Sequence, residues 1–112
     1  MSDVFQALAH PVRREVLHLL RKRPMAAGAL ARCFDLSKPT LSGHFAVLKT
    51  AGLIEAERQG TTILYRLNLP VLEDAIALLA DIVRVARSPS PRGRGNPDIY
   101  FSARFMPKRG GR

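Results

Sequence analysis

The sequence predicts a mainly α-helical domain that carries one two-stranded β-ribbon. Apolar residues recur at helical spacing through most of the first 50 positions. Between residues 53 and 67 the spacing changes to alternation, which is typical of paired strands, and helical spacing returns over 71–86. The chain has 112 residues, of which 46% are hydrophobic. These values fit one small domain with a modest core.

The first two predicted helices meet at the dipeptide His10-Pro11. Residues 3–9 form a short helix with Ser2 as its N-cap. The second helix begins at Pro11, because proline suits the first position of a helix, and it stops before Pro24.

A short helix, a tight turn and a longer helix come next. Residues 26–34 are rich in alanine, and we expect Cys33 to lie inward there as a small buried hydrophobe. Ser37 then caps a helix that continues to Gly52, which supplies the C-terminal stop. The apolar positions of this helix recur at i, i+4 and i+7 and are expected to face the core: Leu41, Phe45 and Leu48.

A hairpin and a last helix complete the predicted domain. Residues 53–58 and 62–67 alternate as strands, with a turn between them, and residues 71–86 form the helix. One apolar stripe of this helix is expected to pack on the domain itself: Leu72, Ile76, Leu79 and Val83. A second stripe predicts a partner helix in a homodimer, with help from Val4 or Leu8 of the first helix. The interface residues of that stripe are Leu78, Ile82 and Val85.

The positive charge of the chain is concentrated after the predicted domain. Eighteen Lys and Arg against nine Asp and Glu give a net charge of +9, which favours nucleic acid over a membrane as partner. Residues 87–112 hold seven of these basic side chains and are rich in Pro and Gly. We therefore expect a folded domain at 1–86 and a disordered basic tail at 87–112.

The predicted element order is that of a helix-turn-helix followed by a wing, the winged helix-turn-helix fold. The stretches ALAHPVRR, SKPTLSGH and GLIEAERQG occur in an order and spacing that resemble the ArsR family of winged-helix repressors. Within that family, the stretch SKPTLSGHFAVLKTAGLI resembles most the SdpR-like autorepressor branch. The resemblance covers about residues 2–86. It implies a bacterial transcriptional repressor that binds palindromic double-stranded DNA as a homodimer.

The recognition helix of such a fold enters the major groove by its N-terminal half, so its polar outward residues are the predicted readers. They are Ser37, Lys38, Thr40, Ser42 and Gly43. The wing is expected to touch the minor groove or backbone phosphates through Arg58, Gln59, Gly60, Thr61 and Thr62. Gly43 has a second interpretation as a neutral surface glycine. His44 is either a half-buried packing residue or a phosphate contact. Arg13 and Arg14 are expected to be solvated or salt-bridging charges, with a phosphate contact as the alternative.

The sequence predicts neither a metal inducer, a cofactor nor an enzyme. Metal-binding members of the family carry a Cys-x-Cys pair where this chain has Ala26 and Gly28, or an Asp-x-His pair in a last helix that here lacks histidine. Cys33, His10 and His18 are isolated, and no catalytic loop or nucleophile motif is present. The chain has no membrane-length apolar run, and we expect a cytosolic protein. Two alternatives stay open: a ligand- or redox-responsive regulator that uses Cys33, and a winged-helix module for protein interaction.

Overall fold

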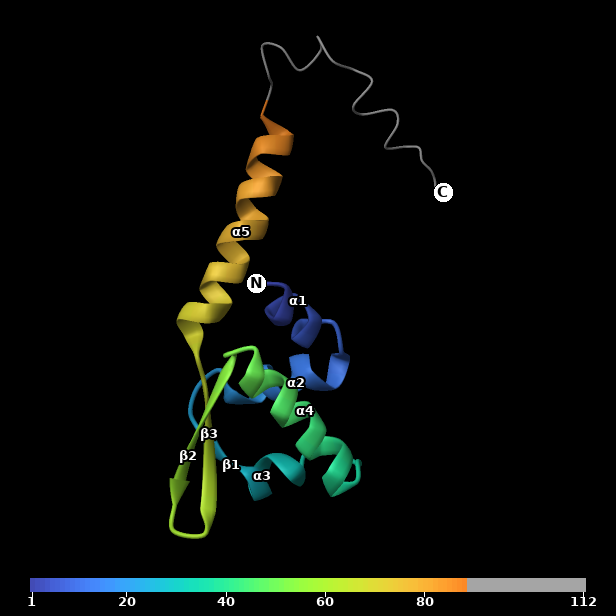
Figure 1. The fold of residues 1–112 in the computed structure, drawn as a ribbon, viewed down its shortest axis with the longest axis vertical. Helices are drawn as coiled ribbons and strands as arrows, with labels where there is room; N and C mark the ends of the chain where they lie inside the picture. Colours follow the sequence, from blue (N-terminus) through green and yellow to red (C-terminus); the bar gives the residue numbers. More distant parts are fainter. Residues whose placement is uncertain (89–112) are drawn as a thin grey trace. The chain divides into compact units, whose positions relative to one another are not determined.

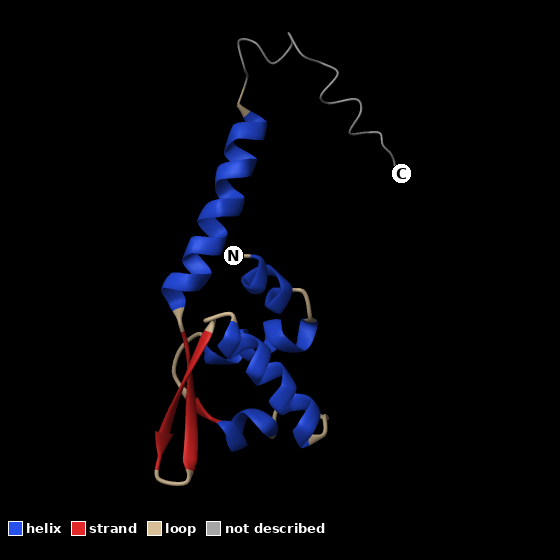
Figure 2. Cartoon of the chain, viewed as in Figure 1, coloured by secondary structure: helices blue, strands red, loops and turns tan. Residues whose placement is uncertain are grey.

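The structure is a computed structural model that describes residues 1–88, and it confirms the predicted fold class (Figures 1 and 2). The helices are α1 (Ser2–Leu8), α2 (Pro11–Leu20), α3 (Ala27–Ala31), α4 (Lys38–Thr50) and α5 (Leu69–Arg87). The strands are β1 (Met25–Ala26), β2 (Ile54–Gln59) and β3 (Thr62–Leu67). The predicted disordered tail lies outside the described residues from position 89 onward.

The sheet has one strand more than the sequence predicts. Its order is β1-β3-β2, and both pairings are antiparallel. Met25 pairs with Tyr65, and Ala26 pairs with Leu64, so the predicted helix at 26–34 starts one residue late and is preceded by a strand. The free edge of β3 offers unpaired backbone groups, and hydrogen bonds to them outweigh the weak local helix preference of two residues.

The core lies between the helices and the sheet and is centred on α4. Leu41, Phe45 and Leu48 of α4 are buried, as their spacing predicts, with Leu48 fully inaccessible. The ring of Phe45 lies 4.7 Å from the ring of Tyr65 on β3. The remaining buried side chains come from the other elements and the turn before β2: Val4, Ala7, Val16, Leu17, Leu20, Leu30, Leu53, Ile54 and Ala75.

Local side chains and glycines set the ends of the elements. The Nδ1 atom of His10 accepts a hydrogen bond from the backbone N–H of Val12 at 3.1 Å and thereby caps α2. The Oγ atom of Ser37 does the same for α4, accepting from the N–H of Thr40 at 3.3 Å. Gly52 and Gly60 have φ angles of +80° and +64°, which favour glycine at the end of α4 and in the hairpin turn.

Three predictions about burial and capping are wrong. Met1, not Ser2, is the N-cap of α1. Cys33 is exposed, because α3 ends at Ala31 and the inward face of that helix does not continue to residue 33. Beyond the partly buried Leu72, the predicted core stripe of α5 is also exposed: Ile76 by 57%, Leu79 by 49% and Val83 by 47%.

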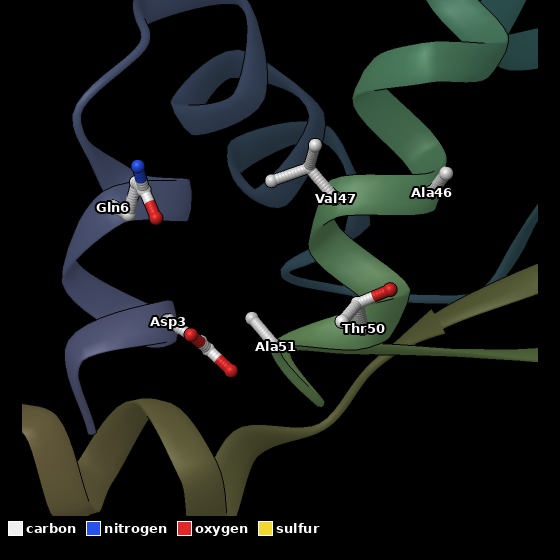
Figure 3. A pocket seen from close by; sticks show the side chains of 6 residues that line it. All are labelled: Asp3, Gln6, Ala46, Val47, Thr50 and Ala51. Atoms are coloured by element: carbon white, nitrogen blue, oxygen red, sulfur yellow. The ribbon is translucent and has the colours of Figure 1, made fainter.

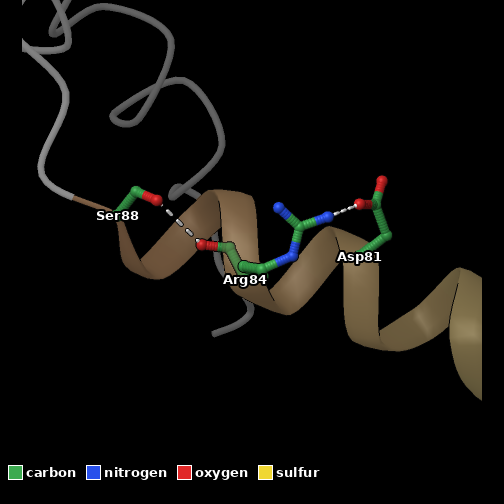
Figure 4. Close-up of polar contacts among 3 residues, drawn as sticks. All are labelled: Asp81, Arg84 and Ser88. Atoms are coloured by element: carbon green, nitrogen blue, oxygen red, sulfur yellow. Dashed lines mark hydrogen bonds and ion pairs between the residues drawn. The ribbon is translucent and has the colours of Figure 1, made fainter.

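The chain divides into two units, Met1–Leu79 and Ala80–Arg112. In the described part of the second unit, the last turns of α5 carry an ion pair between Arg84 and Asp81 (Figure 4). The Oγ atom of Ser88 donates to the carbonyl oxygen of Arg84 at 3.1 Å, where the helix ends (Figure 4). Among residues 1–88, no helix combines the length and the apolar character needed to cross a membrane.

Candidate nucleic-acid interface

The first two turns of α4 present a polar outer face. The predicted readers in and before this segment are all exposed, whereas Leu41 and Phe45 are buried on the opposite side. The hydroxyl of Ser37 accepts from the N–H of Thr40 and also donates to the Oγ1 atom of Thr40 at 2.9 Å. The donor of Ser37 and one of its two acceptor lone pairs are therefore used within the helix start, and the hydroxyl hydrogen of Thr40 is left to point at another acceptor.

Lys38 and Ser42 lie on the flank of α4 that faces α3 and β3. They line a hollow of about 270 Å³ together with Gly28 of α3 and Ile63 of β3. Two predicted readers of α4 thus lie beside strand β3 of the hairpin. Figure 1 shows the start of α4 and the hairpin tip toward the same end of the first unit, with α3 between them.

Gly43 leaves the outer face of α4 without a side chain in the middle of the helix. A Cβ atom built at this position would meet nothing within 4 Å. Packing inside the chain therefore gives no reason for glycine here, although glycine is unfavourable in a helix interior. The open backbone agrees with a close approach by something outside the chain.

Arg13 and Arg14 cap the end of α1, which the sequence analysis did not predict. The Nε and Nη2 atoms of Arg13 donate to the carbonyl oxygens of Ala7 and Gln6 at 2.8 and 3.0 Å. The Nη1 atom of Arg14 donates to the carbonyl of Leu8 at 2.8 Å. Within residues 1–88 neither guanidinium has an ion-pair partner. Arg14 remains exposed, as expected for a solvated charge, and both arginines use their N–H groups to cap backbone carbonyls of α1. Basic residues soon after a short helix were the sequence signal for this capping.

His44 is half-buried beside these arginines. Its Nδ1 atom lies 3.2 Å from the Nη1 atom of Arg13, and its ring centre lies 4.4 Å from that of His10. Burial lowers the pKa of His44 from its ordinary value of 6.5, and the nearby His10 and Arg13 lower this pKa further. The neutral imidazole is the form that fits the site.

The predicted wing is the hairpin of β2 and β3. Arg58 faces Ile63 and Gln59 faces Thr62 across the ladder, so Gly60 and Thr61 form the two-residue turn. The predicted contact residues from Arg58 to Thr62 are all exposed. Arg66 forms an ion pair with Glu57 at 2.5 Å, whereas Arg58 has none within the described part of the chain. Arg58 therefore keeps its charge available at the hairpin tip.

A second hollow lies between α1 and the C-terminal half of α4 (Figure 3). Asp3 and Gln6 of α1 face Val47 and its neighbours across a volume of about 290 Å³. Its lining includes none of the predicted readers. Within residues 1–88, no group of three or more His, Cys, Asp or Glu side chains is placed to hold a metal ion.

Comparisons with known proteins place this fold in a family. The family model described as a helix-turn-helix domain matches residues 8–57. Over 83 residues the chain is 41% identical to the transcriptional repressor SdpR of Bacillus subtilis, and the match covers 74% of this chain and 92% of SdpR. A solved ArsR family transcriptional regulator also matches the chain. The chain belongs to the ArsR family. It is a winged helix-turn-helix transcriptional repressor of that family with a DNA-binding domain.

Solved ArsR structures share the fold. The crystal structure of an ArsR family transcriptional regulator has a TM-score of 0.74 at 30% identity and covers 80% of this chain and 92% of that chain. An ArsR-like transcriptional regulator from Rhodococcus sp. RHA1 has a TM-score of 0.71 at 26% identity, covering 95% and 92%. In this ArsR chain, α3 and α4 are the helix-turn-helix and β2 and β3 are the wing.

Replacing Gly43 by Ala tests what the bare backbone of the ArsR recognition helix does. We expect Gly43→Ala to raise the free energy of unfolding by about 1 kcal/mol, because the site is an uncrowded helix interior. We expect the same variant to bind its DNA several-fold more weakly, because the added methyl group meets the approaching duplex. Urea unfolding and fluorescence anisotropy measure the two effects. Ala46→Gly, on the same exposed face, is the matched control and should only lose stability; unchanged affinity in Gly43→Ala would contradict the close approach.

The lowered pKa of His44 predicts acid-sensitive folding. The unfolded chain binds the proton of this side chain more tightly than the folded chain does, so the contribution of His44 is complete above its ordinary pKa of 6.5. It decreases as the pH falls below that value, toward the lowered pKa of the folded state. We expect His44→Gln, which keeps an acceptor for Arg13, to flatten this decrease in urea-unfolding series. An unchanged pH dependence of the unfolding free energy in His44→Gln would exclude His44 as the cause.

Proposed function

We propose that the chain represses transcription, including that of its own gene, as a homodimer on a palindromic DNA operator and without a metal inducer. The exposed polar face over the first two turns of α4 carries this proposal. Its side chains are Ser37, Lys38, Thr40 and Ser42, with the bare backbone of Gly43 beside them. The similarity to a protein named transcriptional repressor SdpR supports the repression of transcription in this proposal.

The residues of this face have the chemistry of base reading. The ammonium group of Lys38 donates to the guanine O6 and N7 acceptors of the major groove. The methyl group of Thr40 suits the methyl group of thymine, and its hydroxyl hydrogen is available, because the hydroxyl of Ser37 donates to it. In the proposed complex Arg58 and the hairpin turn contact the backbone or minor groove, which adds affinity with little dependence on sequence.

The homodimer is inferred from the uncovered apolar face of α5. Leu78 is 45% exposed, Ile82 58% and Val85 62% within the single chain. An apolar patch of this kind marks an interaction surface, and a two-fold pairing buries the same residues of both copies. On α1, Val4 is only 5% exposed and belongs to the core of its own chain, so Leu8 is the predicted residue there with surface to offer.

The absence of a metal inducer remains a proposal that rests on the ligand chemistry of the described residues. One cysteine and scattered carboxylates do not supply the four convergent ligands of a structural zinc site. The exposure of Cys33 favours a second candidate, a repressor that responds to oxidation of this thiol, over the buried structural role that the sequence predicted.

Alanine substitutions in α4 test the reading face. We expect Lys38→Ala and Thr40→Ala each to weaken binding to a duplex selected from a random library by about 1–3 kcal/mol, with little change for unrelated DNA. Both side chains are exposed, so folding is preserved. Lys49→Ala, at an exposed lysine in the last turn of α4, is the charge-matched control. Equal losses for Lys38→Ala and Lys49→Ala would show a nonspecific charge effect, and no loss in either predicted reader would exclude α4 as the reading element.

Charged residues in α5 test the dimer. We expect the double variant Leu78→Glu, Ile82→Glu to sediment as a folded monomer, because these side chains are exposed in the single chain and the charges oppose burial between copies. The monomer carries only one recognition helix and can contact only one half-site, so we expect it to lose binding to the selected palindrome. Ala77→Glu, exposed and on another face of the helix, should leave the sedimentation coefficient and the affinity unchanged. A dimeric double variant would contradict this interface.

A further inference from the structure

We propose that His10, Arg13 and His44 form a phosphate-binding site that holds the DNA backbone beside the recognition helix. This inference rests on the proposed DNA-binding function and assigns a specific contact to it. Arg13 and His10 come from the start of α2, and His44 comes from α4, so the site joins two elements of the domain.

The charge of Arg13 is held in place without being neutralised. Its guanidinium bonds two backbone carbonyl oxygens of α1 at 2.8 and 3.0 Å and the imidazole of His44 at 3.2 Å. All three partners are neutral acceptors, and no carboxylate of residues 1–88 lies within ion-pair distance of Arg13. A guanidinium that is already ordered loses little freedom when an anion binds to it.

The hydrogen bonds also assign the tautomers of both histidines. A guanidinium only donates, so the Nδ1 atom of His44 facing Arg13 carries no proton. The N–H of Val12 donates to the Nδ1 atom of His10 at 3.1 Å, which assigns the same tautomer there. Each neutral ring therefore carries its hydrogen on Nε2.

These two N–H groups lack acceptors in the described part of the chain. No hydrogen bond within residues 1–88 involves the Nε2 atom of either ring, although the ring centres are only 4.4 Å apart. Two neighbouring donors beside a fixed cation match the several acceptor oxygens of a phosphate group. The amino end of α2, which His10 caps, adds the positive end of a ten-residue helix.

The position of His44 identifies the phosphate as part of the DNA. His44 follows Gly43 directly on α4 and lies next to the face that is proposed to enter the major groove. The sugar-phosphate backbone borders that groove, and phosphates there are commonly held by arginine and by helix N-termini. A phosphodiester at the edge of the half-site is the occupant that we infer.

A double-mutant cycle, which combines a substitution in the protein with a neutralised phosphate in the DNA, tests this contact. Duplexes selected by the wild-type protein are made with one neutral methylphosphonate at each linkage along a half-site. We expect one linkage at the edge of the half-site to cost the wild type about tenfold in affinity, as for a hydrogen bond to a charged group. His44→Leu should bind the unmodified duplex about tenfold more weakly and lose no further affinity at that linkage. Arg14→Gln, which removes a cap of α1 without touching the histidines, should keep the full sensitivity of the wild type.

Three other results would overturn the inference. Multiplicative losses in His44→Leu on the methylphosphonate duplex would show that His44 only supports the fold. His10→Asn keeps an N-cap and should lose less affinity than the wild type when the same linkage is neutralised. A loss equal to that of the wild type would exclude His10 from the phosphate site. Saturation of the histidine ring resonances by inorganic phosphate at micromolar concentration, without coupling to any DNA linkage, would assign the site to a free anion. A wild type that selects no duplex contradicts the proposed function itself, whereas a failed cycle in a protein that binds DNA contradicts only the phosphate site.

Discussion

The burial of one apolar stripe of α4 is the constraint on which the domain and its proposed interface both depend. Leu41, Phe45 and Leu48 are fixed in the core, where Phe45 packs 4.7 Å from Tyr65. Since helix geometry fixes the angle between successive side chains, this packing directs Gly43 outward. The polar face is therefore positioned by the core and not by contacts of its own, and a helix free to rotate on its axis would lose the face together with the packing.

Sequence patterns predicted those parts of the fold in which one face is buried and local chemistry sets the ends. The i, i+4, i+7 spacing located the inner face of α4, and Ser37 located its start. The alternation after Gly52 located the hairpin. Two residues of β1 carry no period, and their pairing depends on the edge of β3, which only the folded chain provides. The inward position expected for Cys33 was wrong because α3 ends earlier than its composition suggests.

Some residues of the proposed site were likewise predictable from the sequence, and others were not. Readers on α4 follow from position in a helix, so a linear pattern was enough to select Lys38 and Thr40. The hydrogen bonds of Arg13 could not be predicted in this way. Its partners are backbone carbonyls six and seven residues earlier and a histidine 31 residues later, and they meet only because α1, α2 and α4 converge. A hydrogen bond from a side chain of one helix to a backbone carbonyl of another does not depend on the side chain of the acceptor residue. Such contacts therefore leave no periodic pattern in the sequence.

The distribution of ion pairs connects these features to DNA binding. In residues 1–88, carboxylates pair with Arg66 on the wing and with Arg84 near the end of α5. The charges of Arg13, Lys38 and Arg58, which lie on or beside the proposed interface, have no such partner there. A polyanion is attracted to charges that the protein leaves uncompensated, so a domain needs no large net charge to orient DNA toward one face. In the proposed complex, long-range attraction brings the duplex to α4, and the donors and bare backbone of that helix discriminate among sequences only after contact.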